Sequence, residues 1–267
     1  MNQTIVALAI NGIVFGLIVA LIALGLSIIF GLLDIINLSH GDFFMVGTVL
    51  TYTTLNTLGL FWPALIIAPL IGFALGVLVQ YSIIQRIKNN AALSIVATFG
   101  LSMIIQEVVR MTFGAAPKRI MSPIQGTFGL FGIEYEWYRI FAAVASIIAI
   151  VAFFIFLKKT KLGTWMRAVR HDRDTATAMG IPTQYVYFFT FGIGFAMAAL
   201  GGVIAAPITT VDFRTGVDIL PFCFMAVIIG GLGNLPGTVA AAVLLTTQKS
   251  SKPFVVEALR LHPPASS

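Results

Sequence analysis

Residues 5–33 read IVALAINGIVFGLIVALIALGLSIIFGLL, and no charged side chain interrupts them. A helix needs about 20 apolar residues to cross the hydrocarbon of a bilayer, so this stretch is long enough to span it. Further uncharged runs lie at 43–85, 89–106, 140–157, 175–211 and 219–248. They predict an all-α, polytopic membrane protein, because a transmembrane barrel would show short segments of alternating hydrophobicity instead.

The composition favours the same class. Of the 267 residues, 58% are hydrophobic and 10% are charged, whereas soluble domains carry about 25% charged residues. The net charge of +6 arises from basic residues in loops beside the apolar runs, which is the positive-inside pattern and does not indicate nucleic-acid binding. The single Cys223 excludes an internal disulfide and is read as a small packed hydrophobe.

Polar and turn-forming residues divide the chain into about seven predicted spans, at about 5–30, 43–60, 62–84, 91–110, 138–157, 184–205 and 220–247. Two interruptions stand out. Polar side chains at 34–42 would be costly at membrane depth, which indicates a broken helix with a short re-entrant turn or an interfacial loop. The glycines and proline of 230–237 break the last segment.

The longest polar block is 158–182, KKTKLGTWMRAVRHDRDTATAMGIP, and it lies between two apolar runs. Placing it in the cytoplasm and alternating single spans puts most Lys and Arg residues on that side. The same alternation makes 85–92 and 248–267 cytoplasmic and the N-terminus external. We expect a membrane domain at 1–247 that includes this loop, followed by a polar tail at 248–267.

No catalytic residue and no metal site is predicted. The three histidines lack metal-ligand spacing, and neither a nucleophile elbow nor a phosphate-binding P-loop occurs. If ATP powers this protein, another polypeptide must therefore hydrolyse it, and the chain itself needs no cofactor.

Asp174-Thr175-Ala176, followed by Gly180, resembles the EAA-xxx-G loop of ABC importer permeases. In that family the loop forms a short cytoplasmic helix that docks into the ATPase subunit. The resemblance implies a set of coupling residues within 158–182: Arg167, Ala168, Asp174, Ala176 and Gly180.

Three other stretches resemble the branched-chain amino acid permeases among these importers. They are GLLDIINLSHGDFFMVG at 31–47, RAVR at 167–170 with Gly180-Ile181, and IGGLGNLPG at 229–237. Interrupted segments in both halves of a transporter indicate its pathway. The predicted pathway residues are Asn37, His40, Gly41, Asp42, Gly231, Gly233, Asn234 and Gly237.

The resemblance implies a multi-pass protein of the bacterial inner membrane that imports branched-chain amino acids; related permeases carry urea or short amides. Its implied partners are a second permease subunit, identical or related, two ATP-binding subunits and a periplasmic solute-binding protein. The family has eight spans and ends in a further apolar span. The polar tail at 248–267 departs from this, through truncation, a frameshift or divergence.

Two readings from other classes stay open. An ion-coupled secondary carrier would need carboxylates at membrane depth, for which Asp34, Asp42 and Glu107 are candidates. A non-transporting membrane assembly subunit would use the basic loop only as an anchor.

Overall fold

The computed structural model describes residues 2–87, 91–130 and 133–261. Its elements follow one another as α1 (Asn2–Leu33), α2 (His40–Leu58), α3 (Ala64–Val79), the π-helical turn η1 (Gln80–Ile84), α4 (Gln85–Ile87), α5 (Ala91–Phe113), β1 (Thr127–Leu130), β2 (Ile133–Glu136), α6 (Trp137–Lys159), α7 (Lys161–His171), α8 (Arg173–Ala178), α9 (Thr183–Ala205), α10 (Thr215–Gly230) and α11 (Leu235–Leu261).

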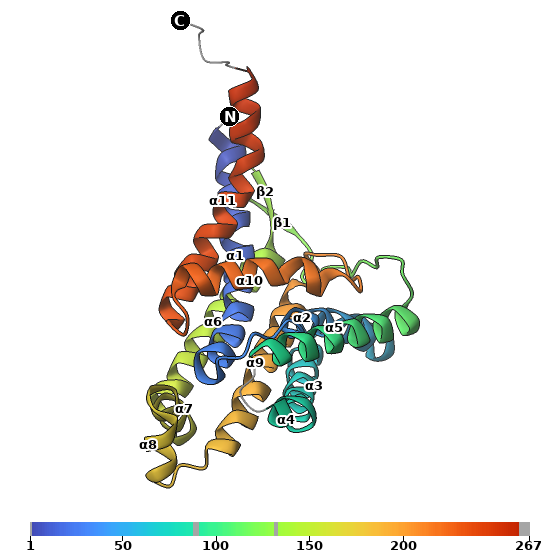
Figure 1. The fold of residues 1–267 in the computed structure, drawn as a ribbon. Helices are drawn as coiled ribbons and strands as arrows, with labels where there is room; N and C mark the ends of the chain where they lie inside the picture. Colours follow the sequence, from blue (N-terminus) through green and yellow to red (C-terminus); the bar gives the residue numbers. More distant parts are fainter. Residues whose placement is uncertain (1, 88–90, 131–132, 262–267) are drawn as a thin grey trace, which may run out of the picture.

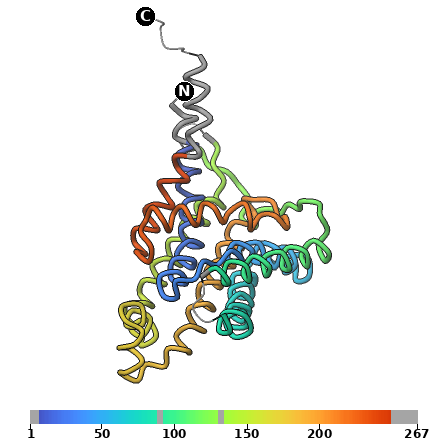
Figure 2. The backbone as a smooth tube through the Cα atoms, viewed as in Figure 1, coloured from blue at the N-terminus to red at the C-terminus, as the bar shows by residue number. Residues whose placement is uncertain are grey.

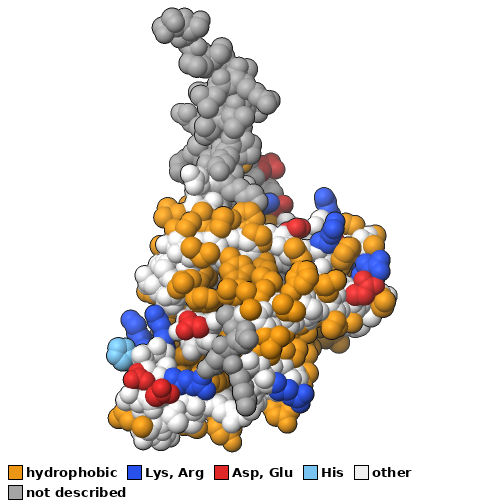
Figure 3. Space-filling view, viewed as in Figure 1, with side chains coloured by type: hydrophobic (Ala, Val, Ile, Leu, Met, Phe, Trp, Pro, Cys, Tyr) orange, Lys and Arg blue, Asp and Glu red, His pale blue; other side chains and the backbone are white. Residues whose placement is uncertain are grey.

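The predicted polytopic helical fold is confirmed. Within the described part of the chain, five helices are long and apolar enough to cross a membrane: 7–33, 64–87, 92–113, 137–159 and 183–205. The apolar stretches of α10 and α11 are shorter. Large hydrophobic side chains on α5 and α6 are exposed, and Figure 3 shows hydrophobic side chains over much of the visible face. This exposure suits helices that face lipid.

Helix α1 forms the centre of the bundle, between α9 and α11 (Figure 1). Glycines allow the close approach: a Cβ added at Gly25 would lie 3.2 Å from the Gly194 Cα atom, and one at Gly16 would lie 2.9 Å from the Val243 Cα atom. Small residues at helix crossings let backbones pack directly in membranes. The uncharged first run is therefore buried by protein, with side chains from 18 to 24 fully covered.

The first interruption occupies 34–39. Helix α1 ends at Leu33, and Asp34 takes a positive φ of 51°. The next helix begins at His40, whose Nε2 lies 3.0 Å from the carbonyl oxygen of Ile22. Ile22 lies eleven residues before the end of α1, so the chain doubles back along α1 by about 16 Å. The predicted break is present, and α2 starts at the depth of the middle of α1.

The second interruption occupies 231–234 and reverses the direction of the chain. Gly231 and Gly233 have φ values of 90° and 76°, which glycine adopts without strain. Figure 2 shows the chain turning back from the orange α10 into the red α11.

Our charge count treated 220–247 as a single interrupted span, and this interpretation needs correction. Helix α11 runs antiparallel to α1, because Gly31 meets Gly233 whereas Gly16 meets Val243. The C-terminal part of α11 therefore lies at the N-terminal end of α1, opposite α7 and α8 (Figure 1). Helix α11 continues without a break past residue 247, where the polar tail was expected to begin.

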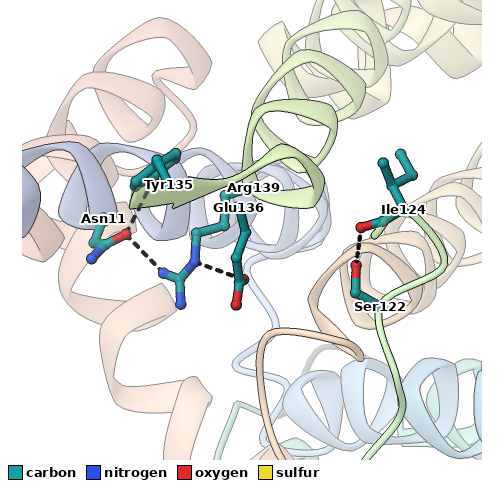
Figure 4. Close-up of polar contacts among 6 residues, drawn as sticks. All are labelled: Asn11, Ser122, Ile124, Tyr135, Glu136 and Arg139. Atoms are coloured by element: carbon teal, nitrogen blue, oxygen red, sulfur yellow. Dashed lines mark hydrogen bonds and ion pairs between the residues drawn. The ribbon is translucent and has the colours of Figure 1, made fainter. Parts of the chain in front are cut away.

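A small hairpin lies within 111–138, which the sequence predicted as a mixed loop. Strands β1 and β2 pair antiparallel, and Figure 4 shows how the hairpin is attached to α1. The Tyr135 hydroxyl donates to Asn11 Oδ1 (3.1 Å), and Arg139 Nη1 donates to the same oxygen (2.7 Å). Arg139 also pairs with Glu136 at 3.2 Å. This end of the bundle is thus held by polar contacts rather than by apolar packing alone.

Candidate translocation and coupling sites

The early polar motif is buried at the depth of the middle of α1. Asn37, Ser39, His40 and Asp42 each have at most 1% of their surface exposed. Asn37 Oδ1 accepts hydrogen bonds from the backbone N–H (3.1 Å) and the hydroxyl (2.8 Å) of Ser39, which closes the turn before α2. Three polar atoms of this motif have no partner in the structure: Asn37 Nδ2, His40 Nδ1 and Asp42 Oδ2. Buried polar atoms without partners are rare and mark sites that can bind another group.

Helix α5 supplies the complementary polar groups, which the sequence analysis missed. The Thr98 hydroxyl accepts from the Leu38 N–H at 3.1 Å. Gln106 Nε2 donates to Asp42 Oδ1 at 3.1 Å and to the Ser102 hydroxyl at 2.8 Å. Ser94, Thr98, Ser102 and Gln106 recur every fourth residue, so they lie along one side of the helix. That spacing within an apolar run was the available signal.

Gly41 brings the motif against the first turn of α10. A Cβ at Gly41 would overlap the carbonyl oxygen of Gly216, and a Cβ at Gly216 would lie 2.8 Å from the Asp42 Cα atom. The start of α2 and the start of α10 therefore cross with backbone in contact. Helix α2 follows the first interruption and α10 precedes the second, so each interruption is next to one helix of this crossing.

The late glycine motif lies elsewhere. A Cβ at Gly31 would lie 2.8 Å from the Gly233 Cα atom, so 231–234 packs on the last turn of α1. That level is about 13 Å along α1 from the Ile22 carbonyl that His40 contacts. Asn234 Oδ1 accepts from the Gly237 N–H at 3.3 Å and starts α11 as an N-cap. The structure thus does not bring the two sets of predicted pathway residues together at one point.

Helix α7 begins the predicted coupling loop and packs on the bundle. The Thr160 hydroxyl caps it by accepting from the Gly163 N–H at 3.0 Å. Gly163, Met166 and Val169 form its buried face. Arg167 Nη1 donates to the backbone carbonyl of Leu157 at the end of α6, and Ala168 is half-buried. Arg167 and Ala168 therefore face or contact the bundle, as residues that hold α7 in place would.

Helix α8 forms the exposed end of the loop. Asp174 and Thr175 are exposed, whereas Ala176 is 3% exposed and packs inward. Gly180 follows the helix with a φ of 82°, and its N–H donates to the Thr177 carbonyl oxygen at 3.0 Å. Of the predicted coupling residues on or directly after α8, Asp174 and Gly180 are thus accessible, whereas Ala176 is buried and packs toward the bundle.

Asp172 is the N-cap of α8 and gives the first testable prediction. Its Oδ1 accepts from the backbone N–H groups of Asp174 (2.9 Å) and Thr175 (3.0 Å), and its Oδ2 accepts from the Thr175 hydroxyl (2.6 Å). These bonds hold the pKa of the Asp172 carboxyl below its ordinary value. A lowered pKa means that the cap stabilises α8 fully above about pH 4 and loses this contribution as the pH falls through the folded value.

We expect Asp172→Ala to increase hydrogen exchange of the α8 amides at neutral pH, whereas Asp172→Asn, which can still accept from the same N–H groups, leaves it near the wild-type rate. Hydrogen-exchange mass spectrometry of the 172–181 peptide measures both. Equal protection in Asp172→Ala and wild type would show that the cap does not order α8.

Residues 8–262 match the family described as "Branched-chain amino acid transport system / permease component". The LivH permease protein of Salmonella typhimurium, named as part of a high-affinity branched-chain amino acid transport system, is 26% identical over 255 residues, covering 88% of this chain and 82% of the relative. The BraD permease protein of Pseudomonas aeruginosa, with the same description, is 25% identical over the same shares.

A relative with another printed cargo also matches. The fructose import permease protein FruF of Bifidobacterium longum is 25% identical over 234 residues, covering 83% of this chain and 62% of the relative. No solved structure matches this chain. The match over nearly the whole chain, together with the helical bundle and its two interruptions, leads to one conclusion: this multi-pass membrane protein belongs to the branched-chain amino acid transport permease family and is a transporter component rather than an enzyme.

Proposed function

We propose that this chain is the membrane permease subunit of an ATP-driven, ABC-type importer. Membership of the permease family supports this role. The observation that carries the mechanism is α8, a capped helix at the end of the bundle, with Asp174 exposed in it and Met179 exposed directly after it. A short exposed helix that is held by the packed α7 suits a contact that passes movement from an ATPase into the membrane.

The proposal includes several partners. Two ATP-binding subunits dock against α8 and hydrolyse the ATP, so this chain binds no cofactor of its own. A second permease subunit, identical or related, completes the pathway. A periplasmic solute-binding protein delivers the cargo at the opposite end of the bundle, where the N-terminal part of α1 and the hairpin lie (Figure 1). The assembly belongs in the inner membrane of a bacterium.

The proposed cargo is a branched-chain amino acid, because LivH and BraD are named for such transport. The buried set of Asn37, His40 and Asp42 offers amide, imidazole and carboxyl groups to the polar end of such a molecule. Fructose, for which FruF is named, and urea or short amides are the competing cargoes.

Reconstitution tests both the class and the cargo. The chain is inserted into liposomes together with its ATPase and second permease, and the binding protein is added outside. We expect ATP-dependent accumulation of labelled leucine, isoleucine or valine, and no accumulation of fructose or urea. Accumulation by this chain alone, driven by an ion gradient, would instead establish a secondary carrier and contradict the proposal.

Gly180→Glu is expected to reduce the ATPase that co-purifies with the solubilised permease by about tenfold or more, a loss of about 1.4 kcal/mol. A residue with a Cβ is strained at a φ of 82°, and the added charge lies beside the exposed face of α8. Pull-down with a tagged permease and quantitative blotting of the ATPase measures the loss.

Gly114→Glu is the matched control. Gly114 has a φ of 83°, and like Gly180 it has open space where a Cβ would be added. It follows α5, which Figure 1 shows on the other side of the molecule from α8, near the pairing of Lys118 with Val211. The same strain and charge at this position should leave the ATPase bound. Equal loss in both variants would mean that the glycine acts on folding and not on coupling.

A further inference from the structure

A cavity of about 90 Å³ lies where the end of α1, the end of α6, the middle of α7 and the start of α11 meet. Its walls are mainly apolar and include Ile28, Leu32, Leu157, Met166 and Leu235. Arg167 and Arg170 also line it. An apolar chamber bordered by two arginines suits a ligand with a hydrocarbon part and an anionic part.

A second hollow of about 350 Å³ adjoins the first and is lined by Arg167, Arg170 and His171. The two hollows share both arginines, so the basic side chains lie at the boundary between the apolar cavity and the more open one. Figure 3 shows blue and pale-blue side chains, with red ones beside them, at the end of the molecule that carries α7 and α8.

These arginines are positioned without a carboxylate. In the described ranges 2–87, 91–130 and 133–261, neither Arg167 nor Arg170 has an ion pair within 4.0 Å. Arg167 is held by the Leu157 carbonyl and by the Thr164 hydroxyl at 3.3 Å. Arg170 lies against Gly233, where an added Cβ would be 2.8 Å from Nη2. The C-terminal ends of α1 and α10 are beside it and favour a cation there. Because neither arginine pairs with a carboxylate in the described ranges, both charges can interact with an anion.

The position along the bundle matches the surface of the membrane. Leu157 is buried and lies one residue before Lys158 and Lys159, the basic end of the α6 span. Helix α7 then buries Gly163, Met166 and Val169. Docking of the ATPase on α8, as in the proposed function, places this end in the cytoplasm, where anionic lipids attract clustered Lys and Arg residues.

We propose that these two hollows bind an anionic phospholipid of the cytoplasmic leaflet. Its phosphate lies among Arg167, Arg170 and His171, and the adjoining apolar part enters the cavity beside Leu157 and Met166. An acidic segment of a partner protein fits less well, because a peptide carboxylate brings no hydrocarbon chain to fill the apolar cavity. The exposed face of α8, which suits a protein partner, is a separate surface.

Lipid binding to the intact, detergent-solubilised chain tests this site. Phosphatidylglycerol and phosphatidylcholine with identical acyl chains are compared by native mass spectrometry. We expect the wild type to prefer phosphatidylglycerol, and Arg170→Gln to reduce that preference about fivefold, the effect of one basic residue near an anionic lipid surface. Leu235→Phe, which fills part of the cavity, should weaken phosphatidylglycerol binding with every charge in place.

Lys161→Gln is the control, because Lys161 is an exposed basic residue on the same helix and lines neither hollow. It should keep the full preference. Equal binding of the two lipids by the wild type, or an equal loss in Lys161→Gln and Arg170→Gln, would overturn the site. Complete displacement of the lipid by inorganic phosphate would also overturn it, in favour of a simple anion site. Retained lipid preference in Arg170→Gln with loss of the ATPase would assign the arginine to a protein partner instead.

Discussion

We expect Gly41→Val to destabilise the protein by about 3 kcal/mol or more, the upper range for overpacking, and to abolish uptake. The added side chain would enter the backbone of Gly216. Two backbones in contact cannot make room by changing a rotamer, so α2 and α10 would have to separate. Thermal unfolding of the detergent-solubilised protein, followed by size-exclusion chromatography, measures the loss.

Gly100→Val is the matched control for this prediction. Gly100 is also helical, in α5, and nothing lies within 4 Å of a Cβ added there. Both substitutions replace a helical glycine by valine, and only the one at Gly41 meets backbone. A similar midpoint for the two variants would contradict the close crossing of α2 and α10.

The second prediction concerns the bond between Gln106 and Asp42. Gln106→Leu leaves the buried Asp42 carboxyl without this partner, at a cost of about 1–3 kcal/mol. Asp42→Leu leaves the half-buried Gln106 amide with the Ser102 hydroxyl as its partner, so we expect a smaller loss. The double variant removes both groups, so we expect it to recover most of the lost stability. Uptake should be lost in all three variants, because the polar groups that we propose for the pathway are missing even where the fold is restored.

Glu107 and Arg110, on the same helix, provide the control cycle. Their ion pair spans 2.6 Å, with about half of each side chain exposed, and such surface pairs contribute at most about 1 kcal/mol. The corresponding leucine variants should show little coupling in stability and should retain uptake. Additive losses in the cycle of Asp42 and Gln106 would mean that their hydrogen bond does not couple the two helices.

The features that sequence predicted well have local causes. Uncharged runs predicted the spans, because length and hydropathy alone decide whether a helix can cross a bilayer. Asp34 and the polar residues after it predicted a break, since they cannot remain in lipid. Gly231 and Gly233 predicted the second break through their conformational freedom. Each of these signals is contained within a few neighbouring residues.

The features that sequence did not predict depend on distant parts of the chain. The depth of His40 is set by its contact with Ile22, and nothing in 34–42 determines that level. Sequence alone does not single out Thr98, because a threonine hydroxyl can bond within its own helix. Here it donates to the Ser94 carbonyl oxygen at 2.8 Å. The reversal at 231–234 could equally have been a kink, and only the packing of α11 along α1 decides between them.

The central position of α1 has a consequence for how the protein is made. Its neighbours come late in the chain: Gly25 meets Gly194, and the Ser27 hydroxyl accepts from the Thr238 hydroxyl at 3.2 Å. At a synthesis rate of about 5–20 residues per second, the ribosome finishes these neighbours about 10–45 s after α1. Helix α1 is therefore made well before the helices that cover it, and until then its small residues face lipid or the insertion machinery.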